Sequence, residues 1–268
     1  MDLHIYQEFA KRFRADYLLR SLPIAVKFFE RSADVPPEAL LPLRDLGKHM
    51  AVCQAFSYAR MKGATVALRR EDHWCWNPLI AFGAVECLPG QPQFDEALKF
   101  IGIQDEEKAR EFFIRFPRLP LHQYEAVVIA PLESASFFPD AVLIYTDSAR
   151  LNHMVRGIKR VTGGCIRSVF DGLDSCVYCT VLPMLENEYR ITLPDPGERE
   201  RARTRDDEII LTVPGARLDE FMESQNPDAR PGRFSDRLFG FELDFDRPPF
   251  YTKLFDLWGL GAPQEEEP

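Results

Sequence analysis

The sequence lacks several features that would point to whole classes of protein. None of its 268 residues lie in an uninterrupted apolar run of roughly 18 or more, the length that spans a bilayer. Its first residues carry charges where a secretory signal peptide has an apolar block. Basic residues are also outnumbered by acidic ones, so the formal net charge is −9 and the pI is about 5.2. Nucleic-acid phosphates and anionic lipids repel an acidic chain, so we expect a cytoplasmic protein with no nucleic-acid and no membrane partner.

Motifs of well-known enzyme classes are absent as well. There is neither a G-x-S-x-G elbow nor an H-E-x-x-H helix. The sequence Thr162-Gly163-Gly164 lacks the G-K-[ST] ending of a phosphate loop, so we predict that it ends a helix. We therefore expect no nucleotide cofactor. No reaction can be read from these residues, and whether the protein is an enzyme stays open.

What is present is the composition of an ordinary globular domain, with 46% hydrophobic and 28% charged residues. The spacing of the apolar residues predicts both helices and strands. Helices are expected at residues 3–19, 50–63, 148–162 and 216–224, and strands at 23–29, 65–69, 126–131, 140–146, 189–194 and 208–213. The predicted fold class is α+β, with a single mixed α/β core domain over residues 1–224 and an extension over residues 225–268.

Two stretches of this core resemble each other. Cys53 and Cys176 each begin a helix-like segment, which is followed at about the same offset by a turn and a strand rich in β-branched residues. This similarity predicts two similar half-units around a mixed sheet. The first strand leads to Cys75, and the second leads to Pro194-Asp195.

Several blocks occur in a fixed order along the chain: PIAVKFF, CQAFSYAR, WCW, APLESASFFPDAVLIYTDSARLNHMVRGI, Ser175-Cys176 and ARTRDDEIILTVPG. Together they resemble the family called domain of unknown function 169 (ArCR), over residues 23–224. The most recognisable part is APLE followed by PD-x-VLIY. The resemblance implies no activity, because the family name records that no general function is established. It implies a Pro-Cys in place of Pro194-Asp195, so this chain would lack one family cysteine.

Cysteine is scarce, because six residues are too few for a disulfide scaffold in a chain of this length. We expect free thiols or metal ligands. Cys53, Cys75 and Cys176 each lie at a predicted helix start or in a loop, where backbone N–H groups favour the thiolate. These three are the candidate metal ligands. The alternative for each is a buried position in the apolar core, because free cysteine is often buried. We predict that Cys87 and Cys165 are such core residues.

Spacing gives the metal hypothesis limited support. Only Cys176 and Cys179 form a C-x-x-C unit, whereas zinc and iron–sulfur sites usually have paired units. On a helix, these two would share one face as core residues. His73 is either a partner of Cys75, as a ligand or a base, or a packed side chain beside two tryptophans.

Arginines recur at every second residue near the end of the core, at Arg199, Arg201, Arg203 and Arg205. On a strand they would place four guanidinium groups on one face, which could bind a carboxylate or a phosphate. The interleaved acidic residues favour a solvated hairpin edge instead. We retain Arg203 and Arg205 as candidate ligand-binding residues.

The preferred hypothesis is a redox or metal-linked protein in which the thiolates of Cys53, Cys75 and Cys176 converge on an iron–sulfur cluster or another soft metal. The first alternative is a non-catalytic module that binds a small anionic metabolite through Arg203 or Arg205. The second is a subunit of a larger assembly. These hypotheses imply a small-molecule ligand, a redox partner or a docked protein.

The C-terminal extension contains two apolar groups. Phe241, Leu243 and Phe245 alternate with acidic residues, so one side of a strand would be apolar. Leu254 to Trp258 follow on a short predicted helix. Leaving such apolar surface in water is costly. We therefore expect the arm to pack on the core or on a second copy, which would make a homo-oligomer, and the last residues to fray.

Overall fold

The computed structural model describes residues 2–226 and 249–259. The chain divides into two compact units, residues 1–231 and 232–268. The first unit contains a sheet with its covering helices, and the second contains helix α12 (Pro249–Leu257). Among the described residues, no helix is both long enough and apolar enough to cross a membrane.

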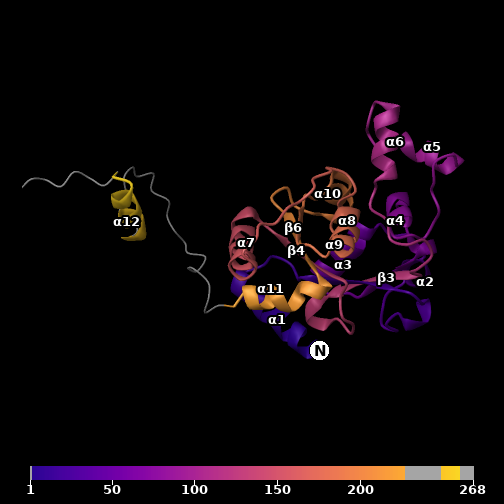
Figure 1. The fold of residues 1–268 in the computed structure, drawn as a ribbon. Coiled ribbons are helices and arrows are strands. Elements are labelled where there is room, and N and C mark those ends of the chain that lie inside the picture. The colour runs from indigo at the N-terminus through magenta and orange to yellow at the C-terminus, as the bar shows by residue number, and fades with distance from the viewer. Residues whose placement is uncertain (1, 227–248, 260–268) are drawn as a thin grey trace, which may run out of the picture. The chain divides into compact units, whose positions relative to one another are not determined.

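A six-stranded sheet forms the centre of the first unit (Figure 1). Its order is β2-β3-β1-β4-β6-β5, and the strands are β1 (Ile24–Phe29), β2 (Val66–Arg69), β3 (Ala126–Pro131), β4 (Ala141–Thr146), β5 (Arg190–Thr192) and β6 (Ile209–Pro214). All five neighbouring pairs are antiparallel, and an isolated parallel bridge joins Leu40 to Val66 beside β2. With its helices, this sheet confirms the predicted α+β class.

The two halves of the sheet repeat one arrangement. In the first half, β1 is followed by α3 (Val52–Lys62), the edge strand β2 and then β3, which lies between β1 and β2. In the second half, β4 is followed by α8 (Ser175–Tyr178) and α9 (Val181–Glu186), the edge strand β5 and then β6, which lies between β4 and β5. Both β3 and β6 end at a proline and continue into a 3-10 turn, η3 (Leu132–Ser134) and η4 (Gly215–Arg217). This order of elements agrees with the predicted half-units.

Both faces of the sheet are covered by helices. The larger core lies between one face, which includes Val26 and Leu143, and the helix side chains of Phe56 and Val177. Residues that alternate with these along the strands point to the opposite face and are buried as well. On that face lie α1 (Leu3–Tyr17), α7 (Ser148–Thr162) and α11 (Leu218–Ser224), of which α7 and α11 also contact β6.

Local sequence signals explain where several helices begin and end. Asp2 and Asp147 accept hydrogen bonds from the first turns of α1 and α7, and Gly63 and Gly163 end α3 and α7 in the left-handed conformation. The remaining short elements are η1 (Ser32–Asp34), α2 (Pro42–Leu46), η2 (Arg70–Asp72), α4 (Trp76–Ala81), α5 (Pro92–Leu98), α6 (Glu106–Ile114) and α10 (Pro196–Ala202).

Helix α10 corrects one sequence prediction. We expected the arginine-rich stretch to form either a strand with its arginines on one face or, preferably, a solvated hairpin edge, but Pro196–Ala202 is helical. The Asp195 side chain accepts a hydrogen bond from the Glu198 N–H, and Pro196 occupies the first helical position. The helix forms despite the alternating charges, because residues that alternate only in charge give a strand no apolar face to bury.

The C-terminal predictions are only partly covered by the structure. Residues 254–257 lie on helix α12, as expected, and the large apolar side chains of Leu257 and Trp258 are exposed within this unit. The strand expected around Phe241 to Phe245 lies outside the described residues. Docking of the arm, on the core or on a second copy, stays a prediction.

Candidate functional site

The three predicted ligands, Cys53, Cys75 and Cys176, line one cavity of about 390 Å³. They come from three separate segments of the chain, which the fold brings together at the ends of several helices. The other lining residues are Val52, Trp76, Asn77, Pro78, Phe100, Leu173, Asp174, Asp195, Pro196, Gly197, Glu198, Glu200 and Arg201. We call this space the cysteine cavity.

Each half-unit contributes two equivalent positions to the cysteine cavity. Cys53 and Cys176 are the second residues of α3 and α8. Cys75 and Asp195 are the N-cap residues of α4 and α10, the helices that follow the two edge strands. The cavity therefore lies where four helix starts meet, and Asp195 stands where the repeat would place the counterpart of Cys75.

The three thiols do not favour the thiolate, so the expectation drawn from their positions at helix starts is wrong for the thiols by themselves, because burial dominates. Burial raises the pKa of Cys53 to about 12, and the neighbouring Glu198 and Cys75 add to the shift. Burial also raises the pKa of Cys176, with a further contribution from Cys53, and that of Cys75. Cys75 packs against the small buried group formed by Cys53, Ala51 and Ala202. The thiols thus lie close enough to influence one another, and only a bound cation would make them ionise near neutral pH.

A buried carboxyl group connects the cavity to the core. Glu198 is 1% exposed and accepts hydrogen bonds from Tyr145 at 2.5 Å and Thr204 at 3.3 Å. The Ser175 hydroxyl lies 2.6 Å from Glu198 and 3.0 Å from Asp195. The single hydroxyl proton can be donated fully to only one of these carboxyl groups, and burial raises the pKa of Glu198.

Ion pairs and polar contacts fix the surroundings of Glu198. The Arg60 guanidinium pairs with Glu208 at 2.8 Å, donates to Thr204 at 3.2 Å and stacks on the Tyr145 ring at 4.0 Å. Arg60 belongs to α3 in the first half-unit, whereas Glu208 precedes β6 in the second. This buried pair therefore joins the two halves directly behind the cysteine cavity.

Asp174 is a second unusual carboxyl group on the cavity wall. Its backbone is left-handed, with φ of 49°, and its side chain accepts a hydrogen bond from Asn77 at 2.5 Å. Burial raises its pKa to about 7, and the nearby Asp171 and Asp195 contribute to the shift. Asp174 therefore changes its charge near neutral pH, which is the range in which an acid or base is useful.

Other sequence candidates lie elsewhere. His73 packs against the Phe82 ring at 5.8 Å, and burial lowers its pKa to about 4, so the structure favours the packed alternative. Arg203 ends α10 and Arg205 is exposed, and neither is among the residues that line the cysteine cavity. Arg201, from the same stretch, does line it and stacks on Trp74 at 4.8 Å.

The remaining cysteines separate into surface and core. Cys87 and Cys179 are buried in the larger core, as expected for Cys87, but Cys165 is exposed, so its assignment to the core is wrong. All six cysteines are free thiols. The C-x-x-C pair is thus split, since Cys176 reaches the cavity and Cys179 does not line it.

Sequence reasoning missed Asp174, Asp195, Glu198 and Arg201 as cavity residues. The signal that could have found two of them is Asp195-Pro196 followed by Glu198, a helix start directly after an edge strand. In the part of the chain that the structure describes, no three side chains of Cys, His, Asp or Glu form a group that could hold a metal ion as they stand. A metal would therefore have to draw the side chains together.

Comparisons with known proteins agree with the resemblance read from the sequence. The profile of the DUF169 family, described as uncharacterised ArCR, matches residues 12–224. An uncharacterised protein of Methanocaldococcus jannaschii, MJ0308, is 24% identical over 227 residues, which covers 84% of this chain and 95% of that protein. No solved structure matches the chain significantly. The predicted family is confirmed, and the chain belongs to the DUF169 family.

Proposed function

We propose that this protein binds a soft metal ion or an iron–sulfur cluster through the thiolates of Cys53, Cys75 and Cys176. The observation that carries the proposal is the convergence of these three thiols, from three segments and both half-units, on one cavity. Sulfur ligands select soft ions such as zinc and copper, and iron–sulfur clusters. The protein would then serve as a redox or metal-linked component of the cell.

The charges around the cavity favour a cation. The lining contains four carboxyl groups, those of Asp174, Asp195, Glu198 and Glu200, and one guanidinium group, that of Arg201. Burial raises the pKa of Asp174 and Glu198, so these two carry less negative charge near neutral pH. The lining still offers a small anion a single guanidinium group among acidic side chains, which argues against the anion-binding alternative. A metal ion would be stabilised by the same carboxylates, and it would lower the raised pKa values of the thiols.

The three thiols leave room for a further ligand. Asp195 is already engaged, because it accepts from the Glu198 N–H at 2.7 Å and from the Ser175 N–H at 3.0 Å and lies 3.0 Å from the Ser175 hydroxyl. Three protein ligands with a fourth position open to water or substrate are typical of reactive metal sites, whereas structural zinc sites are usually closed by four. Cys53, Cys75 and Cys176 would hold the metal, and a fourth ligand would have to come from water or substrate.

Metal loading tests this proposal directly. The full chain is purified without oxygen, scanned for the absorbance of an iron–sulfur cluster, and titrated with Zn²⁺ or Cd²⁺ while the cadmium–thiolate band is followed. We expect about one site per chain, with affinity reduced about tenfold or more by Cys53→Ser, Cys75→Ser or Cys176→Ser. Cys165→Ser is the matched control, because Cys165 is an exposed thiol outside the cavity. Absence of stoichiometric binding, or equal losses in all four variants, would refute the proposal.

A further inference from the structure

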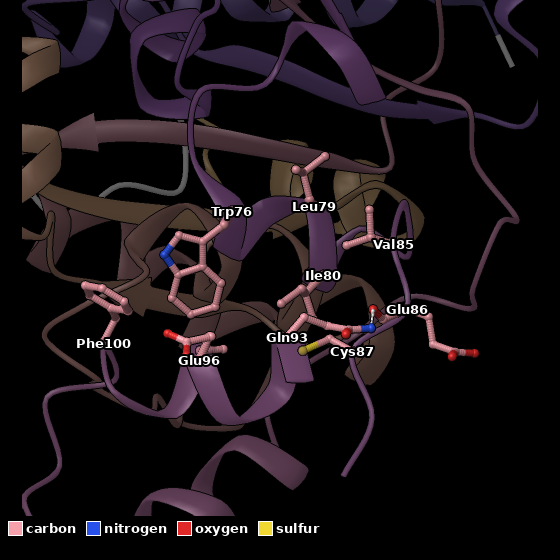
Figure 2. Close-up of a pocket in the computed structure, with 10 residues that line it drawn as sticks. Trp76, Leu79, Ile80, Val85, Glu86, Cys87, Gln93, Glu96 and Phe100 are labelled. Carbon is pink, nitrogen blue, oxygen red and sulfur yellow. Dashed lines mark hydrogen bonds between the residues drawn. The ribbon is translucent and has the colours of Figure 1, made fainter. Parts of the chain in front are cut away.

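A second pocket, of about 490 Å³, lies beside the cysteine cavity (Figure 2). It is formed by α4, α5 and the segment between them. Its walls are mainly aliphatic and aromatic, and the full lining is Trp76, Leu79, Ile80, Val85, Glu86, Cys87, Gln93, Glu96, Ala97 and Phe100. Its volume falls within the range of about 300–1,000 Å³ that is usual for small-molecule sites. We call it the apolar pocket.

The two spaces share part of their walls. Trp76 and Phe100 line both the apolar pocket and the cysteine cavity. Figure 2 shows these two rings together at one end of the apolar pocket, with Val85, Glu86 and Cys87 toward the other end. A molecule lying in the apolar pocket would therefore have one end next to the cavity that contains the thiols.

The lining restricts what the pocket can bind. The charged side chains among its walls, Glu86 and Glu96, are both acidic and exposed, so they disfavour a ligand with a carboxylate or phosphate. The flat ring of Trp76 and the aliphatic side chains of Leu79 and Ile80 offer contact area to hydrocarbon or aromatic groups. The side chains in the lining that could hydrogen-bond a ligand are few: Gln93, the two acidic residues, the indole N–H of Trp76 and, weakly, the thiol of Cys87.

We infer that the apolar pocket binds an uncharged, largely apolar small molecule, held against Trp76 and Phe100 at the border of the cysteine cavity. This inference goes beyond the proposed metal site and stands without it, because none of the three proposed ligands lines the apolar pocket. If the metal site also exists, the same molecule is placed to present one end to it.

The uncharged fluorescent dye Nile red is a suitable probe, because its emission shifts to the blue in an apolar site. We expect saturable binding of one dye per chain, with energy transfer from tryptophan that falls in Trp76→Phe. Val85→Phe places a bulkier ring in the pocket and should weaken binding about tenfold. Leu88→Phe is the matched control, since Leu88 is an exposed residue of the same segment outside the lining.

Two further variants keep the test decisive. Phe100→Ala removes a wall residue that is 71% exposed, so it should weaken dye binding without unfolding the chain. Cys53→Ser should leave dye binding unchanged, which separates this inference from the metal proposal. Equal dye affinity in Val85→Phe, Leu88→Phe and the wild type, all checked for folding by circular dichroism, would overturn the inference. So would a lack of saturable binding, as expected if another protein segment fills the pocket.

Discussion

The two half-units offer different side chains to the cysteine cavity. The first offers two thiols, Cys53 and Cys75, and the second offers one thiol, Cys176, and the carboxyl group of Asp195. Asp195 caps α10 with its side chain, whereas Cys75 makes no side-chain hydrogen bond to the start of α4. The second half has therefore gained a helix cap where the first has a free thiol. Equivalent positions of a duplicated fold can thus hold a candidate metal ligand in one half and a helix-capping carboxylate in the other.

The largest effect is expected from breaking the buried pair that joins the halves. Arg60→Leu leaves Glu208 buried without its partner, since the two side chains are 2% and 6% exposed. Such a loss typically costs about 3–5 kcal/mol. Urea unfolding followed by circular dichroism measures it. The exposed pair of Arg31 and Asp34 is the control, because exposed ion pairs contribute little to stability and Arg31→Leu should leave the unfolding midpoint almost unchanged. Similar losses of unfolding free energy in both variants would show that burial does not decide how much an ion pair stabilises this protein.

Replacing Asp195 with cysteine would give both half-units a thiol at the N-cap of the helix after the edge strand. Asp195→Cys should raise affinity for Cd²⁺ about tenfold or more, because a fourth sulfur can complete the coordination of a soft ion. It should also lower stability by about 0.5–2 kcal/mol, since the hydrogen bond to the Glu198 N–H is lost. Competition titration and thermal melting measure the two effects.

Asp195→Ser is the matched variant for that exchange. Serine can still cap α10 but supplies no thiol, so it should keep stability closer to the wild type without tightening cadmium binding. Tighter binding in both variants would mean that the carboxylate had merely obstructed the site. Unchanged binding in Asp195→Cys would indicate that position 195 does not reach the metal.

The metal proposal also predicts a dependence on pH. Because burial raises the pKa of Cys53 to about 12 and that of Cys176 above its usual range, both thiols must release protons when a metal binds. Affinity for Zn²⁺ should therefore rise with pH between 6 and 8, by about tenfold per unit for each proton released. Titrations in buffers of equal ionic strength measure the slope. A slope of zero would mean that the thiols are not the ligands.

Much of the fold could be predicted from the sequence because its signals are local. The apolar runs of β3 and β4, the Asp147 cap and the left-handed Gly63 all act within a few residues. The convergence of Cys53, Cys75 and Cys176 was also anticipated, through the internal repeat and the helix starts. Asp174 and Glu198 were not, because their raised pKa values arise from burial by segments distant in sequence. The hairpin edge predicted from the alternating charges of residues 198–208 is wrong, because the Asp195 cap and Pro196 start a helix there.

The last expected effect concerns Asp174, a residue of the second half-unit on the wall of the cysteine cavity. Its pKa is raised from 3.8 to about 7 in the folded protein, so folding favours the protonated form. The stabilising effect of that proton is complete below pH 3.8 and is lost as the pH rises to about 7. Asp174→Asn keeps an oxygen that can accept from Asn77, suits the left-handed backbone and carries no charge. The variant should therefore match the wild type near pH 3 and become more stable than it as the pH rises, by about 3–4 kcal/mol at pH 7.5. Melting curves at several pH values measure this difference, with Asp206→Asn, an exposed change, as the control. A difference that stays constant with pH would show that Asp174 does not titrate in this range.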